Sequence, residues 1–137
     1  MDHLILVKHA KGAPGLRVFG LGPNLLPQQG VIKLQKLLHC NTSWAKKRNV
    51  KNIKTMLSNS EVVVSVWKNR EIIGFGRATT DGVYRAILWD IVVEEKFQKS
   101  GLGKKIIEAI LKNSLISASE KIYLMTTHCK QFYNNVG

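Results

Sequence analysis

Residues 86–111 have the sequence AILWDIVVEEKFQKSGLGKKIIEAIL, which contains an apolar strand, a glycine-bearing turn and an amphipathic helix. The strand, residues 86–93, is nearly continuously apolar, as expected of a strand that is covered on both faces. The helix repeats apolar residues at the spacing of one helical face, at Leu102, Ile106, Ile107, Ile110 and Leu111. The stretch therefore predicts a strand that leads into a helix through a tight turn.

The turn between this strand and this helix is a candidate anion site. Such a turn directs several backbone N–H groups and the positive end of the helix dipole at one point. Lys104 and Lys105 lie in the first helical turn, where cations gain little unless an anion is nearby. Glycines are also common in strand-to-helix turns for steric reasons alone, so a purely structural turn is the alternative.

The spacing of the glycines excludes two phosphate-binding loops and matches a third. A Walker loop requires G-x-x-x-x-G-K-[ST], and a dinucleotide fingerprint requires G-x-G-x-x-G; neither is present. The residues here are Gln98-x-x-Gly101-x-Gly103, separated from Val92-Val93 by four residues. This pattern resembles the acetyl-CoA signature of the GNAT superfamily of N-acyltransferases, and residues 132–137, FYNNVG, are similar to the family's F-Y-x-x-x-G-F motif.

The resemblance covers about Gln28 to Gly137 and implies the α/β, mixed-sheet GNAT fold. Within the family, residues 78–81, residues 88–93 and the tail look most like the plastid and cyanobacterial group of serotonin, or arylalkylamine, N-acetyltransferases. The sequence stops at Gly137, where the family continues into further strands, so the C-terminal strands are absent from it, either because this is a shortened member or because the sequence is incomplete. Part of the acceptor pocket would then be missing or come from a partner subunit, which leaves a homodimer open.

The resemblance also implies which residues hold the cosubstrate, acetyl-CoA. In the family the central strand and the strand after the crossover splay apart, and the pantetheine arm lies in the gap. The implied pantetheine partners are backbone atoms of Ile91, Val92 and Val93. The implied pyrophosphate ligands are amides of the loop and first helical turn: Gln98, Lys99, Ser100, Gly101, Leu102, Gly103 and Lys104. Thr127 stands where many relatives carry an asparagine that bonds the cofactor arm, and no metal is implied.

Transfer to an amine needs a base that keeps the amine neutral and an acid that protonates the departing thiolate. Tyr133 stands where the family's acid often stands; its alternative role is packing. Asp90 is the only acid within the apolar strand, so desolvation would raise its pKa and favour a base. Its alternative is a carboxylate paired with arginine or backbone amides for structure. Weaker candidates are Glu94, Glu95 and His128 as base, and Cys129 as the site of a covalent acyl-enzyme.

The 137 residues predict a single domain with a net charge of +12. Residues 1–60 carry ten Lys and Arg against one acid, Asp2, so this half attracts polyanions. A non-catalytic basic binding module is therefore an alternative, although no nucleic-acid-reading motif is present, which disfavours nucleic acid as a partner. Cys40 and Cys129 are too few for a zinc site or a disulfide framework. The sequence shows neither a membrane span nor a signal peptide, which predicts a soluble protein of the cytoplasm, or of the plastid stroma if it is plastid-encoded.

The rest of the chain predicts the element order β-α-α-β-β-β-α-β-α. The expected elements are a short strand at residues 16–21, helices at 31–38 and 46–57, a hairpin of strands at 61–67 and 71–79, the central strand, a helix from 102 to about 115, a strand at 121–127 and a short helix at 129–135. Trp44, between the first two helices, is expected in the core. The helix from Leu102 should connect two parallel strands.

The acceptor is predicted from the subgroup and the charge. The subgroup implies a small arylalkylamine such as serotonin or tryptamine, whereas related enzymes act on protein lysines and N-termini. An amine is cationic and a +12 protein repels it unless acids line the entrance, for which Asp90, Glu94 and Glu95 are the nearest candidates. A small aromatic amine needs less compensation than a lysine-rich peptide, which favours the arylalkylamine.

Overall fold

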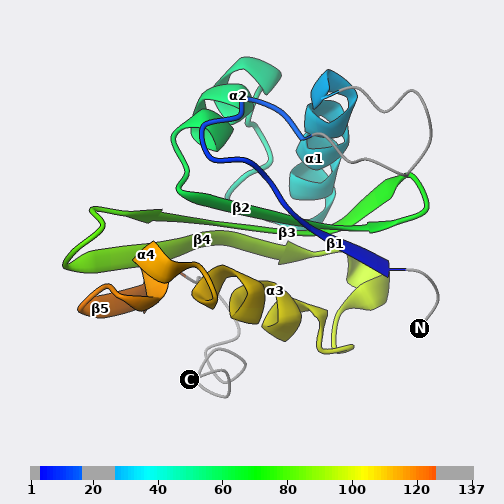
Figure 1. The fold of residues 1–137 in the computed structure, drawn as a ribbon. Coiled ribbons are helices and arrows are strands. Elements are labelled where there is room, and N and C mark those ends of the chain that lie inside the picture. The colour runs from blue at the N-terminus through cyan, green and yellow to red at the C-terminus, as the bar shows by residue number, and fades with distance from the viewer. Residues whose placement is uncertain (1–3, 17–26, 126–137) are drawn as a thin grey trace.

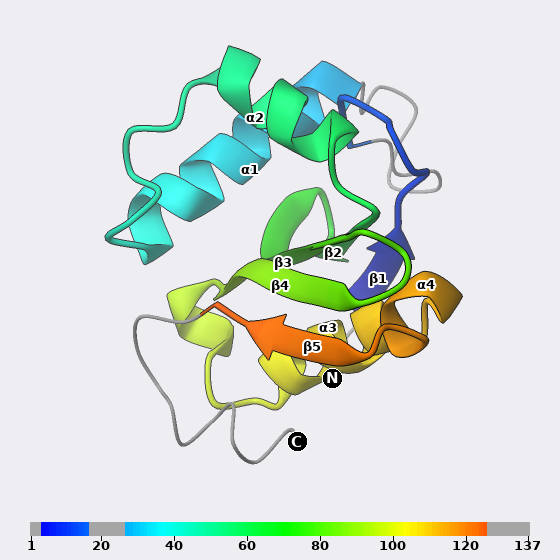
Figure 2. The ribbon, with the colours of Figure 1, turned by 90° about the vertical axis from the view of Figure 1, so that its left-hand side faces the viewer.

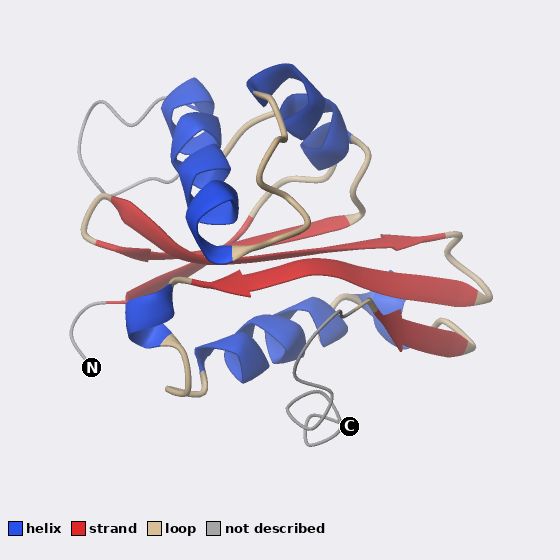
Figure 3. Ribbon diagram, turned by 180° about the vertical axis from the view of Figure 1, so that it is seen from behind, coloured by secondary structure: helices blue, strands red, loops and turns tan. Residues whose placement is uncertain are grey.

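A computed structural model describes residues 4–16 and 27–125, and these residues form a five-stranded sheet with helices on both faces (Figures 1 and 3). The elements in chain order are β1 (Leu4–Lys8), α1 (Pro27–Asn41), α2 (Val50–Ser58), β2 (Val62–Lys68), β3 (Glu71–Thr80), β4 (Arg85–Val93), the 3-10 helix η1 (Glu95–Phe97), α3 (Leu102–Leu111), α4 (Ser114–Ser117) and β5 (Lys121–Leu124). The strands lie in the order β1-β2-β3-β4-β5, and all neighbours are antiparallel except β4 and β5, which are parallel. The predicted mixed α/β sheet and the parallel crossover through α3 are confirmed.

Two apolar cores lie on opposite faces of this sheet. One packs α1 and α2 against residues such as Phe75 and Val92. The other packs Ile106, Ile107 and Ile110 of α3 against residues such as Leu88. Because β4 contributes to both cores, it is covered on both faces, as its apolar sequence predicts.

The first strand lies elsewhere than predicted. Residues 4–8, not residues 16–21, form β1, which pairs antiparallel with β2 from Leu4↔Lys68 to Lys8↔Val64. Leu16 is fully buried in a loop, and its carbonyl oxygen would lie 2.5 Å from a Cβ at Gly30 of α1. Leu16 therefore packs under a helix, while residues 17–21 lie outside the described part of the chain.

Local capping explains most differences at the helix ends. α2 begins at Val50 instead of residue 46, because the Asn49 side chain accepts a hydrogen bond from Asn52 N at 2.8 Å and so caps the helix. The helix after the glycine turn ends at Leu111 instead of near 115, because Asn113 starts a new turn by accepting from Leu115 N and Ile116 N. α1 is longer than predicted, and β5 ends at Leu124, before the predicted 127. The predicted helix at 129–135 lies outside the described residues.

Candidate active site

Within the described part of the chain, the edge of β4 that faces β5 is paired along only half of its length. Figure 2 shows β5 lying beside β4. Register partners run from Arg85↔Lys121 to Leu88↔Leu124, and Met125 N donates to Leu88 O at 3.1 Å. From Trp89 to Val93, no strand among the described residues pairs with this edge. A ligand could therefore pair with main-chain groups that a continuous sheet would have used itself.

The direction of these main-chain groups follows from the ladder with β3. Glu94 N donates to Ile73 O at 2.8 Å, so the main-chain groups of Glu94 and, two residues earlier, Val92 face β3. Those of Ile91 and Val93 face the opening by alternation. Gln98 Nε2 donates to Val93 O at 3.0 Å, which already engages one of them. Of the three predicted pantetheine partners, Ile91 and Val93 thus have suitably directed main-chain groups, whereas Val92 does not.

A β-bulge lies where the pairing of β4 with β5 ends. Between Trp89↔Arg77 and Val92↔Phe75, β4 has one more residue than β3. Asp90 has φ 55°, in the left-handed region that aspartate tolerates better than most residues. The bulge therefore places Asp90 at the start of the unpaired part of the β4 edge, residues 89–93, which we call the open edge of β4.

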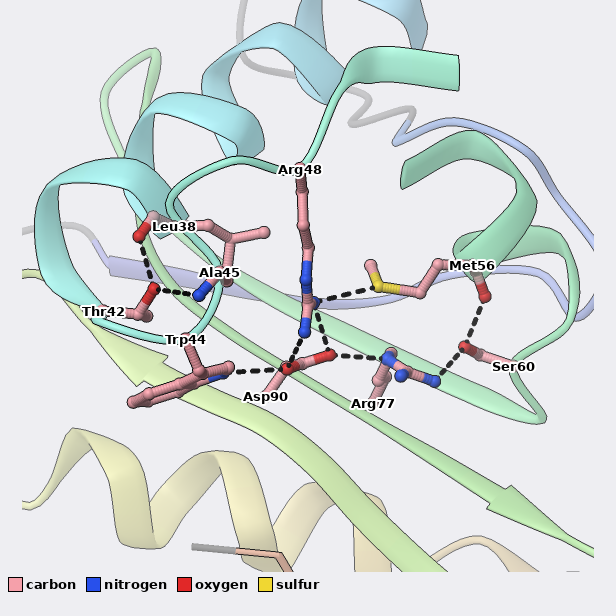
Figure 4. Close-up of polar contacts among 9 residues, drawn as sticks. All are labelled: Leu38, Thr42, Trp44, Ala45, Arg48, Met56, Ser60, Arg77 and Asp90. Atoms are coloured by element: carbon pink, nitrogen blue, oxygen red, sulfur yellow. Dashed lines mark hydrogen bonds and ion pairs between the residues drawn. The ribbon is translucent and has the colours of Figure 1, made fainter. Parts of the chain in front are cut away.

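The Asp90 carboxylate is buried and accepts hydrogen bonds from three side chains (Figure 4). Arg48 Nη1 and Nη2 donate to its two oxygens at 2.9 and 3.0 Å, Arg77 Nε donates at 2.8 Å, and Trp44 Nε1 donates to Oδ1 at 3.2 Å. We refer to Asp90, Arg48, Arg77 and Trp44 as the Asp90 cluster. Its fixed charges are two guanidinium groups and one carboxylate, so their formal sum is +1.

This arrangement corrects the sequence-based expectation for Asp90. Burial alone would raise the pKa of this carboxyl, as expected, but the hydrogen bonds and charges of Arg48 and Arg77 outweigh burial and hold the pKa below its usual value. The prediction of a raised pKa is therefore wrong, and the alternative of a carboxylate paired with arginine describes the geometry. Asp90 also cannot offset the charge of an incoming amine, because two cations already neutralise it.

The Asp90 cluster ties the segment between α1 and α2 to the sheet. Arg48 also contacts Met56 Sδ at 3.4 Å, and Arg77 Nη1 donates to Ser60 Oγ at 3.3 Å. Trp44, predicted as a core residue, is 43% exposed, so that prediction is wrong. Arg48 and Arg77 were missed because they lie 42 and 13 residues from Asp90 in the sequence. The available signal was the acid itself, because a carboxylate inside a buried strand requires a cationic or N–H partner.

The N-terminus of α3 fits a diphosphate. Gly101, the N-cap, has φ 86° and supplies no side-chain cap, and the first helical bond runs from Lys105 N to Gly101 O at 3.1 Å. The amides of the first turn, residues 102–104, thus have no acceptor within the helix. A Cβ at Gly101 would meet no atom within 4 Å, the first turn holds no acid, and Lys104 and Lys105 are exposed. Open space, free N–H groups and cations meet there, as an anionic group requires.

The other predicted site residues have more local roles or lie outside the described chain. Glu94 Oε2 accepts from Lys96 N at 2.8 Å and caps η1, and Glu95 is exposed. The Ser100 hydroxyl donates to Phe97 O, and Lys99 is exposed with φ 64°. Four predicted candidates lie outside the described residues: Thr127, His128, Cys129 and Tyr133.

A groove of about 370 Å³ lies on the α1 side of the sheet, away from the Asp90 cluster. Lysines outnumber glutamates along it: Lys33, Lys36, Lys68 and Lys96 against Glu71 and Glu94. Lys33 pairs with Glu71 at 3.0 Å, and Lys68 Nζ lies 5.3 Å from the centroid of the Phe97 ring. Because the groove borders neither Asp90 nor Gly101, we do not place the reacting atoms in it.

Within residues 4–16 and 27–125, no helix has the length and apolarity that a membrane span requires. Over the same ranges, His, Cys, Asp and Glu side chains form no group of three that could hold a metal ion.

Comparison with known proteins agrees with this geometry. A family model described as an acetyltransferase (GNAT) domain matches residues 58–137. An uncharacterized N-acetyltransferase ycf52 from Gracilaria tenuistipitata var. liui is 30% identical over 99% of this chain and 75% of its own length. The histone acetyltransferase TAP1 of Glycine max is 30% identical over 78% of this chain and 51% of its own length.

The fold is also that of solved acetyltransferases. A GNAT-family acetyltransferase from Streptococcus pneumoniae TIGR4 superposes with a TM-score of 0.70 at 16% identity, over 98% of this chain and 86% of that one. The chain spans about half the length of most of the curated relatives that it matches. The family model covers more than half of the chain, and the Gracilaria relative aligns over nearly all of it. The chain therefore belongs to the GNAT family of acetyltransferases.

Proposed function

We propose that the protein transfers the acetyl group of acetyl-CoA to the primary amine of a small arylalkylamine such as tryptamine or serotonin. One observation carries the acetyl-CoA part of this proposal: the open edge of β4 lies in the same strand–turn–helix unit as the uncapped N-terminus of α3. The first feature suits the amide groups of a pantetheine arm, and the second suits a diphosphate. Acetyl-CoA contains both groups in one molecule.

In the proposed reaction the neutral amine nitrogen attacks the thioester carbonyl carbon, and the C–N bond forms as the C–S bond breaks. The nitrogen gives up one proton to solvent, and the departing sulfur takes one from the proton donor. Main-chain groups of Ile91 and Val93 would hold the arm, and the amides of residues 102–104 would hold the diphosphate. We propose Tyr133 as the proton donor, from the family motif. Tyr133→Phe should then lower kcat by about 100-fold with little change in acetyl-CoA affinity. We do not propose Asp90 as the base, because its oxygens already accept hydrogen bonds from Arg48 and Arg77, which hold its pKa below the usual value.

The arylalkylamine acceptor rests on the subgroup resemblance and on charge. The candidate site offers an ammonium group no free carboxylate at Asp90, so affinity must come largely from the apolar part of the acceptor. A lysine-rich peptide brings more positive charge and less apolar surface. Protein lysine acetylation is the second candidate, because a relative is named a histone acetyltransferase.

A matched pair of charge reversals on α3 tests the cosubstrate. Lys104→Glu places an acid among the free amides, whereas Lys112→Glu makes the same change in net charge at the far end of the helix. An acid in the first turn favours the helix dipole, so lost affinity in Lys104→Glu would not come from unfolding. We expect Lys104→Glu to weaken acetyl-CoA binding about tenfold by calorimetry, and Lys112→Glu to keep the parent's affinity. Equal affinities in the two variants would contradict the diphosphate site.

The acceptor is tested by CoA release with tryptamine, serotonin, a polyamine and a basic peptide, each at matched concentration. We expect the highest kcat/KM with the two aromatic amines. Faster turnover of the peptide would reverse the ranking in favour of protein acetylation. A parent protein that binds acetyl-CoA but acetylates none of the four would contradict the proposed acceptor class.

A further inference from the structure

Trp44 is an exposed aromatic residue whose ring is nevertheless held in place. Its side chain is 43% exposed, and its Nε1 donates to the buried carboxylate of Asp90 at 3.2 Å (Figure 4). The indole nitrogen is only a donor, so a buried anionic acceptor fixes the ring orientation. The adjoining backbone is also anchored, because Ala45 N donates to Thr42 Oγ1 at 3.0 Å and Thr42 Oγ1 donates to Leu38 O at 2.7 Å.

The Trp44 ring therefore meets β4 at the bulge. It bonds to Asp90, one residue before the free main-chain groups of Ile91. A molecule held along the open edge of β4 would thus have an indole beside it.

Other aromatic side chains lie on the same face of the sheet. Trp89 shares this face with its register partner Arg77, whose guanidinium lies 5.4 Å from the Trp89 ring centroid. Tyr123 of β5 is the register partner of Ile87, two residues before Trp89, and it is 44% exposed. Because side chains alternate along a strand, Ile87, Trp89 and Tyr123 point to one face, from which Trp44 also approaches β4. This face combines exposed aromatic surface with a cluster of formal charge +1.

We propose that Trp44 is a wall of the acceptor site and selects amines that carry a flat apolar group. Stacking on a fixed ring favours an aromatic acceptor by more than its buried area alone. The Asp90 cluster offers an ammonium no net attraction, so an aliphatic polyamine gains little from it. Asp90, Arg48 and Arg77 are positioning residues that act through Trp44. This inference rests on the proposed acetyltransferase function and specifies which part of the acceptor is recognised.

Steady-state kinetics with tryptamine and putrescine test the wall. Trp44→Ala removes the ring, and Trp44→Phe keeps an aromatic ring but loses the N–H donor. Tyr84→Ala is the control, because it removes a 59% exposed aromatic ring near the start of β4, away from the bulge. For Trp44→Ala we expect KM for tryptamine to rise about tenfold while kcat/KM for putrescine changes less than twofold. Trp44→Phe should lie between parent and Trp44→Ala, and Tyr84→Ala should match the parent.

The positioning role is tested through Arg48→Gln, which leaves Trp44 itself unchanged. We expect KM for tryptamine to rise while kcat stays near the parent value and the acetyl-CoA-induced thermal shift is retained. If the parent acetylated tryptamine and Trp44→Ala kept its KM, or lost both amines equally, the wall would be refuted and the acetyltransferase function would stand. If the parent bound acetyl-CoA but acetylated neither amine, the proposed acceptor and the wall would fall together.

Discussion

Replacing Asp90 by asparagine should destabilise the fold even though the shape of the side chain is kept. Asparagine tolerates positive φ as aspartate does, so the 55° at position 90 can remain. The amide, however, has one acceptor oxygen and no charge, so the three hydrogen bonds from Arg48 and Arg77 cannot all be kept. Removing one partner of a buried ion pair destabilises by about 3–5 kcal/mol. We expect about 3 kcal/mol, because the Arg48 side chain is 29% exposed and can turn to water.

Urea unfolding at pH 7, followed by tryptophan fluorescence and by circular dichroism, measures this difference. A loss of 3 kcal/mol should lower the unfolding midpoint by about 1.5 M. Glu108→Gln is the matched carboxylate-to-amide control on the exposed face of α3, and we expect it to stay within about 0.5 kcal/mol of the parent. In a double-mutant cycle, Arg48→Gln should cost much less in the Asp90→Asn background than in the parent.

The pH dependence of this difference is also set by the cluster. The folded pKa of Asp90 lies below 3.8, so its stabilisation is present above pH 3.8 and is lost as the pH falls through the folded pKa. The gap between parent and Asp90→Asn should therefore be constant from pH 7 to about pH 4.5 and shrink in stronger acid. An Asp90→Asn variant as stable as the parent at pH 7 would show that the cluster contributes nothing to stability. A gap that vanished well above pH 3.8 would instead contradict the lowered pKa of Asp90.

The remaining predictions concern a histidine and two glycines. Burial lowers the pKa of His9 from 6.5 to about 4, so the stability linked to it is complete above pH 6.5 and is lost as the pH falls to about 4. Between pH 7.5 and pH 4.0, the free energy of unfolding of His9→Gln, measured with urea, should therefore fall by about 3 kcal/mol less than that of the parent. Gly76→Ala would place a Cβ 2.7 Å from Ile106 Cγ2, and this overpacking should lower the free energy of unfolding by about 1–3 kcal/mol; a variant as stable as the parent would contradict the close approach of α3. Gly101→Ala and its control Gly82→Ala both introduce a Cβ at positive φ, with no atom within 4 Å at Gly101 and only Leu115 Cδ2 at 4.0 Å at Gly82, so each should lose about 1–2 kcal/mol. Only Gly101→Ala should also reduce the thermal shift induced by acetyl-CoA.

Much of the central unit was accessible from sequence because its signals are local. The apolar run of β4, the glycine turn and the periodicity of α3 each depend on residues within a few positions of one another, and β4 and the start of α3 lie where predicted. The hairpin of β2 and β3 was accessible for the same reason. The glycine spacing also indicated the family, and the free amides of α3 follow from any helix that starts at an uncapped glycine.

The partners of β1, Asp90 and Trp44 depended on tertiary structure. Leu4–Lys8 becomes a strand only because β2, about 60 residues later, supplies its hydrogen-bond partners. The pKa of Asp90 is lowered instead of raised because arginines from two other segments donate hydrogen bonds to the carboxylate. Burial in an apolar strand was therefore not enough to predict the direction of the pKa shift. Trp44 donates its N–H to that same carboxylate from 46 residues away in the sequence while its ring stays 43% exposed. Charge interactions depend on distances in space and on the partners that share the same low-dielectric site, and neither quantity is encoded in the spacing of residues along the chain.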